Sequence, residues 1–135
     1  MNRVVHYEIH AEDIERAKKF YSSVFGWEMQ QMGSEYGNYV IVKSGPGADE
    51  PADSKQPGIN GGLMARNAPT PPQGMGPNAF VCTIGVDDID TYIKKVEAAG
   101  GVAQTDKMEV PNVGWLRYYK DTEGNIFGML QPVSM

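Results

Sequence analysis

The chain has 135 residues, of which 12 are basic and 17 are acidic, so its formal net charge at pH 7 is −5. This length fits one domain with a core of its own, and the negative charge argues against nucleic-acid binding and against attraction to anionic membranes. No apolar run approaches the roughly 20 residues of a membrane span, and no signal-peptide pattern opens the chain, so we expect a cytoplasmic protein. The single cysteine, Cys82, excludes an internal disulfide, and we expect its thiol to be buried and inert.

The first 26 residues predict a strand followed by a helix. Residues 4–9, "VVHYEI", alternate as a strand does, and residues 13–24 carry apolar side chains at helical spacing. Asp13 suits the N-cap of this helix, and Gly26 suits its end. Alternation places His6 and Glu8 on one face of the strand. We expect His10, between strand and helix, to be exposed or to cap the helix.

Two strand-like segments follow, "EYGNYVIVKSG" at 35–45 and "GINGGLMA" at 58–65. The paired glycines Gly61 and Gly62 indicate either close approach of a ligand or of another backbone, or a bulge. The stretch 44–58 is rich in Gly, Pro and Asp, which predicts a mobile surface loop or a lid over a pocket. The stretch 67–79, rich in Pro and Gly, predicts a linker.

The second half of the chain repeats the first. "AFVCTIGV" predicts a strand, "DDIDTYIKKVEAAGG" a helix capped by Asp87 or Asp88, and "GWLRYYKD" and "GNIFGMLQ" two further strands. A shift of 75 positions places Asp13 on Asp88, and a shift of 66 places Gly62 on Gly128. An internal duplication of a βαβββ unit accounts for both offsets.

These features resemble the vicinal oxygen chelate superfamily, which includes glyoxalase I, bleomycin-resistance proteins and extradiol dioxygenases. The resemblance rests on "HYEIHAEDIERAKKFYSSVFGWE" in the first unit and "VDDIDTYIKKVEAAGG" with "KDTEGNIFGMLQ" in the second, and it covers essentially the whole chain. It implies a single α+β domain in which two βαβββ modules, about 1–66 and 80–135, form an open, cup-shaped mixed sheet around a small-molecule site. It also implies a homodimer.

The resemblance further implies where a metal ion would be held. Metal-dependent members place one ligand on the first strand and one on the last strand of each module, and these positions match His6, Gly62, Val81 and Gly128. Only His6 has a donor atom, and no Asp, Glu or His occurs in 56–68 or 124–135. A divalent ion needs three or four protein ligands. We therefore expect no cofactor, because the family's chelate is dismantled in this chain.

Function hypotheses from different classes stay open. The ligand count favours a metal-independent protein that binds a small organic molecule in the sheet cup. The alternative is a lyase, isomerase or dioxygenase whose metal is held by His6, Glu8 and ligands outside the family set. A third reading is a metal-free enzyme with Glu8 as the catalytic base. The residues that we expect to line the pocket are His6, Glu8, Gly62, Val81, Thr83, Trp115 and Gly128.

Overall fold

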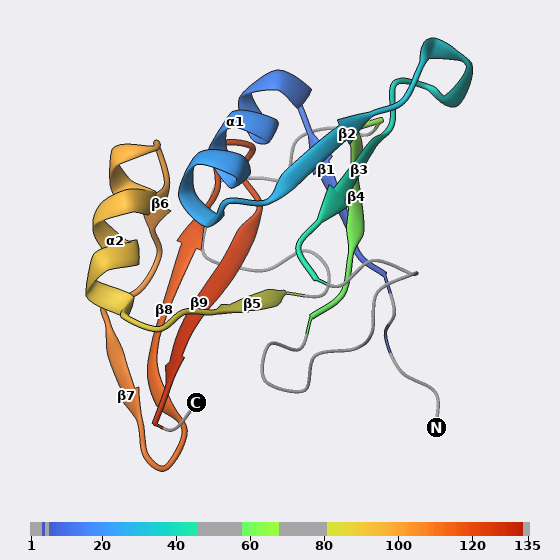
Figure 1. Ribbon diagram of the computed structural model, residues 1–135. Coiled ribbons are helices and arrows are strands. Elements are labelled where there is room, and N and C mark those ends of the chain that lie inside the picture. Colours follow the sequence, from blue (N-terminus) through green and yellow to red (C-terminus); the bar gives the residue numbers. More distant parts are fainter. Residues whose placement is uncertain (1–3, 5, 46–57, 68–80, 134–135) are drawn as a thin grey trace. The chain divides into compact units, whose positions relative to one another are not determined.

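The computed structural model describes residues 4, 6–45, 58–67 and 81–133 (Figure 1). Two compact units make up the chain, Met1–Ala68 and Pro69–Met135. Most of the predicted loop 44–58 and of the predicted linker 67–79 lies outside the described residues. In the described part of the chain, no helix is both long and apolar enough to cross a membrane.

The first unit is one four-stranded mixed sheet with a single long helix. Its strands run in the order β1-β4-β3-β2, with β1 parallel to β4 and the other pairs antiparallel. In chain order the elements are β1 Glu8–Ala11, α1 Ile14–Phe25, β2 Glu28–Gln31, a short 3-10 helix η1 Ser34–Tyr36, β3 Val40–Lys43 and β4 Gly61–Ala65.

The helix α1 begins and ends where the sequence predicts. The Asp13 side chain accepts a hydrogen bond from the Arg16 backbone N–H at 3.1 Å, and so satisfies a donor that the first turn leaves without a helical partner. Gly26 ends the helix with φ at +72°, a left-handed conformation that glycine adopts without steric cost. Packing of α1 on β2 and β4 buries one stripe of side chains, namely Ala17, Phe20, Tyr21 and Val24.

The pairing register of the strands shows which residues lie on each face of the sheet. Ile9 pairs with Leu63, and Leu63 pairs with Val40; these three side chains belong to the core between the sheet and α1. The alternate positions Glu8 and Gly62, which pair with each other, therefore lie on the opposite face, which we call the helix-distal face. This alternation agrees with the prediction that His6 and Glu8 share a face.

The second unit repeats this plan. Its sheet follows the order β5-β9-β8-β6, with β5 parallel to β9, and the additional strand β7 pairs with β8. The helix α2 has Asp88 as its N-cap and packs on β6 and β9. Its elements are β5 Cys82–Gly85, α2 Ile89–Ala98, β6 Val102–Ala103, β7 Met108–Val110, β8 Gly114–Lys120 and β9 Ile126–Pro132.

The edge beside β8 is interrupted, which the sequence did not predict. β6 pairs with Tyr119 and Lys120, while β7 pairs with residues 114–116, so both short strands lie along the same side of β8. Between them the Thr105 hydroxyl accepts the Tyr118 backbone N–H at 3.2 Å. A side chain thus supplies the hydrogen bond that a continuous strand would have made, and the βαβββ plan holds with one divided strand.

Two expectations about single residues are corrected. Cys82 is exposed, because it opens β5, a strand at the edge of its sheet. His10 lies within β1, opposite Met64, because the strand runs on to Ala11. The predicted strand also begins later than expected, since β1 starts at Glu8. His6 lies just before it, although the Tyr7 carbonyl still accepts the Gly62 N–H at 2.9 Å.

Candidate functional site

The Tyr39 side chain is the central feature of the helix-distal face in the first unit. Tyr39 precedes β3, and its side chain crosses β4 at Gly62 to reach β1. A Cβ atom built on Gly62 would lie 1.6 Å from the Tyr39 hydroxyl oxygen and 2.1 Å from its Cζ. Only glycine therefore permits this ring to lie against the strand, and the aromatic ring covers the backbone that the glycine leaves bare.

The Tyr39 hydroxyl joins two of the predicted site residues. It donates to the Glu8 Oε2 at 3.1 Å and lies 3.1 Å from the His6 Nε2. The other Glu8 oxygen, Oε1, lies 3.5 Å from the His10 Nε2. Burial, and then the hydrogen bond and the charge of Glu8, raise the pKa of Tyr39 above its ordinary value, because each disfavours the phenolate. The hydroxyl therefore keeps its proton.

The paired glycines make room for aromatic side chains on both faces of β4. On the helix side, a Cβ on Gly61 would lie 2.5 Å from the Tyr7 ring, whereas Gly62 meets Tyr39 on the other face. Pairing of β4 with β3 continues across both glycines without a bulge. The bulge interpretation was therefore wrong, and the close approach is made by tyrosine side chains of the same unit.

The second unit places a tyrosine beside the repeat-related glycine. Thr83 pairs with Gly128, as Glu8 pairs with Gly62, and Tyr118 pairs with Gly128 from β8. A Cβ on Gly128 would lie 3.0 Å from the Tyr118 Cε1 and 3.1 Å from the Thr83 Oγ1. Thr83, Tyr118 and Gly128 therefore come together on the face turned away from α2. Val81, half-buried, lies just before β5.

The four implied ligand positions do not fit a divalent metal ion. His6 carries a donor but directs its Nε2 to Tyr39, and Val81 has none. Neither glycine has a donor atom; at Gly62 no ligand side chain could stand without displacing the Tyr39 ring, and at Gly128 the Tyr118 ring lies close by. Among the described residues, no group of three or more His, Cys, Asp or Glu side chains is arranged to hold a metal ion.

Comparison with known proteins identifies the relatives of this chain. Residues 3–45 match the model of a bleomycin resistance protein-like N-terminal family. A glyoxylase-like domain-containing protein of Didymella fabae is 32% identical over 121 residues, which are 87% of this chain and 84% of that protein. The chain belongs to the glyoxalase/bleomycin-resistance family of the vicinal oxygen chelate superfamily.

Longer relatives and solved structures of this family also match. A mycobacterial protein named "Putative glyoxylase CFP32", from Mycobacterium bovis and Mycobacterium tuberculosis, is 30% identical over 129 residues; the match covers 92% of this chain, which spans only 43% of that protein. The fosfomycin resistance protein FosX of Listeria monocytogenes has a TM-score of 0.71 at 12% identity, covering 99% of this chain and 93% of FosX. TnmS3 from Streptomyces sp. CB03234 has a TM-score of 0.65 at 20% identity, covering 98% and 97%. Both structures share the predicted family fold.

Within the second unit, one predicted pocket residue lies on the other face of the sheet. Strict pairing along β8 places Trp115 on the face opposite Tyr118 and Gly128. There the Lys107 ammonium lies 4.6 Å from the centre of the Trp115 ring and pairs with Asp90 of α2 at 3.0 Å. Trp115 thus belongs to the helix side of its sheet.

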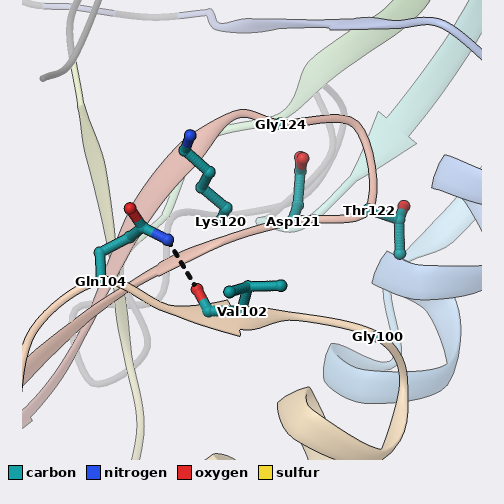
Figure 2. Close-up of a pocket in the computed structure, with 7 residues that line it drawn as sticks. All are labelled: Gly100, Val102, Gln104, Lys120, Asp121, Thr122 and Gly124. Atoms are coloured by element: carbon teal, nitrogen blue, oxygen red, sulfur yellow. Dashed lines mark hydrogen bonds between the residues drawn. The ribbon is translucent and has the colours of Figure 1, made fainter. Parts of the chain in front are cut away.

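An open hollow of about 350 Å³ lies elsewhere in the second unit, between the α2–β6 turn and the β8–β9 turn (Figure 2). Figure 2 shows the Gln104 side chain turned back to the Val102 carbonyl, at 3.2 Å. The buried Asp121 carboxylate accepts the backbone N–H groups of Glu123 and Asn125 at 2.8 and 2.9 Å. These hydrogen bonds hold together the turn between β8 and β9.

Tyr39 was not among the predicted site residues. A signal for it exists in the pattern: a tyrosine immediately before one strand, and paired glycines in the strand that pairs with it. The spacing alone does not reveal that the ring lies across Gly62, because this depends on β3 pairing with β4 and on the direction of the side chain.

Proposed function

We propose that this protein binds a small organic molecule without a metal ion, using the helix-distal faces of its sheets. The observation that carries the proposal is the pair of tyrosine rings at the glycines where metal-dependent relatives would hold ligands, Tyr39 at Gly62 and Tyr118 at Gly128. Such rings offer flat apolar surface, and nearby polar groups such as Glu8 and His6 would orient a ligand.

Two fold neighbours with this architecture bind different kinds of ligand. TnmS3 is described as an antibiotic binding protein, whereas FosX was crystallised with Mn(II) and 1S,2S-dihydroxypropylphosphonic acid. Ligand sets rather than fold distinguish such activities. The donor count of this chain supports binding without a metal ion. The family resemblance supports a homodimer, and the net charge of −5 supports the absence of nucleic-acid and membrane partners.

Elemental analysis of the untagged protein, followed by titration with Ni²⁺, Zn²⁺, Mn²⁺ and Fe²⁺, tests the absence of a metal. We expect sub-stoichiometric metal and no binding tighter than about millimolar, since a single imidazole cannot replace three or four ligands. His6→Ala is the matched variant. One tightly held ion per subunit that is lost in His6→Ala would contradict the proposal and favour a metal-dependent lyase, isomerase or dioxygenase using His6 and Glu8.

Binding itself is tested by a ligand-observed NMR screen of small aromatic and heteroaromatic compounds, antibiotics among them. Saturable ligands that lose affinity in Tyr39→Ala or Tyr118→Ala are expected. Trp115→Ala is the control, because Trp115 lies on the helix side of its sheet. Ligands whose affinity depends on Trp115 and not on either tyrosine would place binding on the other face and contradict the proposal.

A further inference from the structure

The hydrogen bonds around Tyr39 have a fixed direction. A tyrosine hydroxyl has one proton, and an ionised carboxylate has none to donate. Tyr39 therefore uses its proton on the Glu8 Oε2, and the contact of 3.1 Å with the His6 Nε2 requires that His6 be the donor. The His6 ring consequently carries its proton on Nε2, and its Nδ1 is an acceptor when the ring is neutral.

This arrangement leaves acceptors rather than donors for a ligand. Each carboxylate oxygen can accept two hydrogen bonds, and each Glu8 oxygen has one partner in the described part of the chain, Tyr39 or His10. The Glu8 side chain is 42% exposed, so its remaining lone pairs are accessible. The His6 residue is exposed as well.

No arginine or lysine neutralises Glu8 among the described residues. The nearby Arg66 donates instead to the His10 carbonyl at 3.0 Å, and its Nε lies 3.9 Å from Glu12. Within the described residues, the ionic contact of Glu8 is the long one to His10, at 3.5 Å. A negative charge thus lies next to the Tyr39 ring, whose hydroxyl end lies against Gly62 and which is partly exposed.

We infer that the first unit binds an alkylamine that carries an aromatic ring: its protonated nitrogen donates to Glu8 and its flat apolar part packs on Tyr39. This inference rests on the proposed function and specifies its ligand class. The array of acceptors matches the donors of an ammonium group, and the ring matches the apolar part; a cation beside a tyrosine ring gains further attraction. The net charge of −5 favours a cation over an anion at long range.

The test uses three probes of similar size: 2-phenylethylamine, 2-phenylethanol and 3-phenylpropionate. Binding is followed by saturation-transfer NMR and by the two histidine Cε1–H signals of the protein, since the chain has only two histidines. His6→Gln assigns them. We expect the amine to bind at least about 10-fold more tightly than the alcohol, with the carboxylate weakest, and to shift the His6 signal.

Glu8→Gln keeps the size of the side chain and removes its charge, so we expect it to abolish the preference for the amine. Glu28→Gln is the matched control: Glu28 lies opposite Lys43 in the strand register, on the same face of the sheet, whereas the carboxylate that accepts from the Tyr39 hydroxyl belongs to Glu8. Its affinities should equal those of the parent protein.

Tighter binding of the carboxylate or the alcohol, or amine binding that survives Glu8→Gln, would overturn the inferred ligand class. So would failure of the amine to bind at millimolar concentration. None of these outcomes affects the proposed function, which depends on the metal titration and on ligands of any charge that require Tyr39 or Tyr118. Conversely, tight metal binding would reject the proposed function whatever the amine does.

Discussion

The Tyr39 hydroxyl contributes to stability as well as to the candidate site, because it connects β3 with Glu8 of β1 and with His6. Its pKa is raised by burial and by Glu8. The folded state therefore favours the protonated phenol more than the unfolded chain does. The resulting stability is fully present below a pH of about 10, the ordinary value for tyrosine, and is lost as the pH rises through the folded-state pKa.

Tyr39→Phe tests this reasoning. Below pH 9 we expect the variant to be less stable by about 1 kcal/mol, the usual net value of a partly exposed hydrogen bond. Above pH 10 the difference in stability between the two proteins should shrink. Ionisation of Tyr39 removes its hydrogen bond to Glu8 and so destabilises the parent protein, whereas phenylalanine does not ionise. The free energy of unfolding in urea, measured from pH 8 to 11, gives the comparison. A difference that is constant or grows with pH would contradict the assignment.

At the scale of elements, the sequence predicts those parts whose signals are local. The helix α1 follows from Asp13, its apolar spacing and Gly26, and all three act within a few residues. The strand β2, in contrast, reads "EMQQ" and has no alternating apolar pattern; only Met29 packs against the core. It is a strand because it pairs with β3 at the edge of the sheet, a tertiary interaction that the sequence does not display.

The residues of the candidate site likewise fall into those that the sequence predicted and those that it did not. Alternation places His6 and Glu8 together, and the duplication relates Gly62 to Gly128. Neither signal identifies Tyr39, because its contact with them depends on pairing between β3 and β4. The exposure of Cys82 was missed for a related reason: an apolar stretch predicts burial only if the strand has neighbours on both sides, and β5 is an edge strand.

The interrupted edge beside β8 provides a prediction about an element. Because the Thr105 hydroxyl accepts the half-buried Tyr118 N–H, Thr105→Val should leave this donor without its partner and destabilise the protein by about 1–3 kcal/mol. Thr105→Ser retains the hydroxyl and should cost less than half as much. Thermal or urea unfolding measures both. A loss in Thr105→Ser without a loss in Thr105→Val would show that the methyl group, rather than the hydroxyl, matters at this position.

At the scale of the whole molecule, the two units share one plan but differ in how much room remains at the glycine in the ligand position that the resemblance implies. A Cβ on Gly62 would overlap the Tyr39 ring, at 1.6 Å from its hydroxyl oxygen, whereas one on Gly128 would lie 3.0 Å from Tyr118. The first separation requires Tyr39 to leave its position and its hydrogen bonds. The second requires neighbours to shift by only a few tenths of an ångström.

We therefore expect Gly62→Ala to destabilise the protein by about 1–3 kcal/mol, as overpacking does, and Gly128→Ala to cost less than about 1 kcal/mol. Combining Gly62→Ala with Tyr39→Ala should remove most of the cost of the glycine change, whereas Gly128→Ala with Tyr118→Ala should be nearly additive. Urea unfolding of the two double-mutant cycles measures both coupling energies. Equal coupling energies in the two cycles would contradict the view that a tyrosine ring fills the space beside the glycine in the first unit only. A larger coupling in the first would mean that the position of Gly128 accepts a side chain at a lower cost than the position of Gly62.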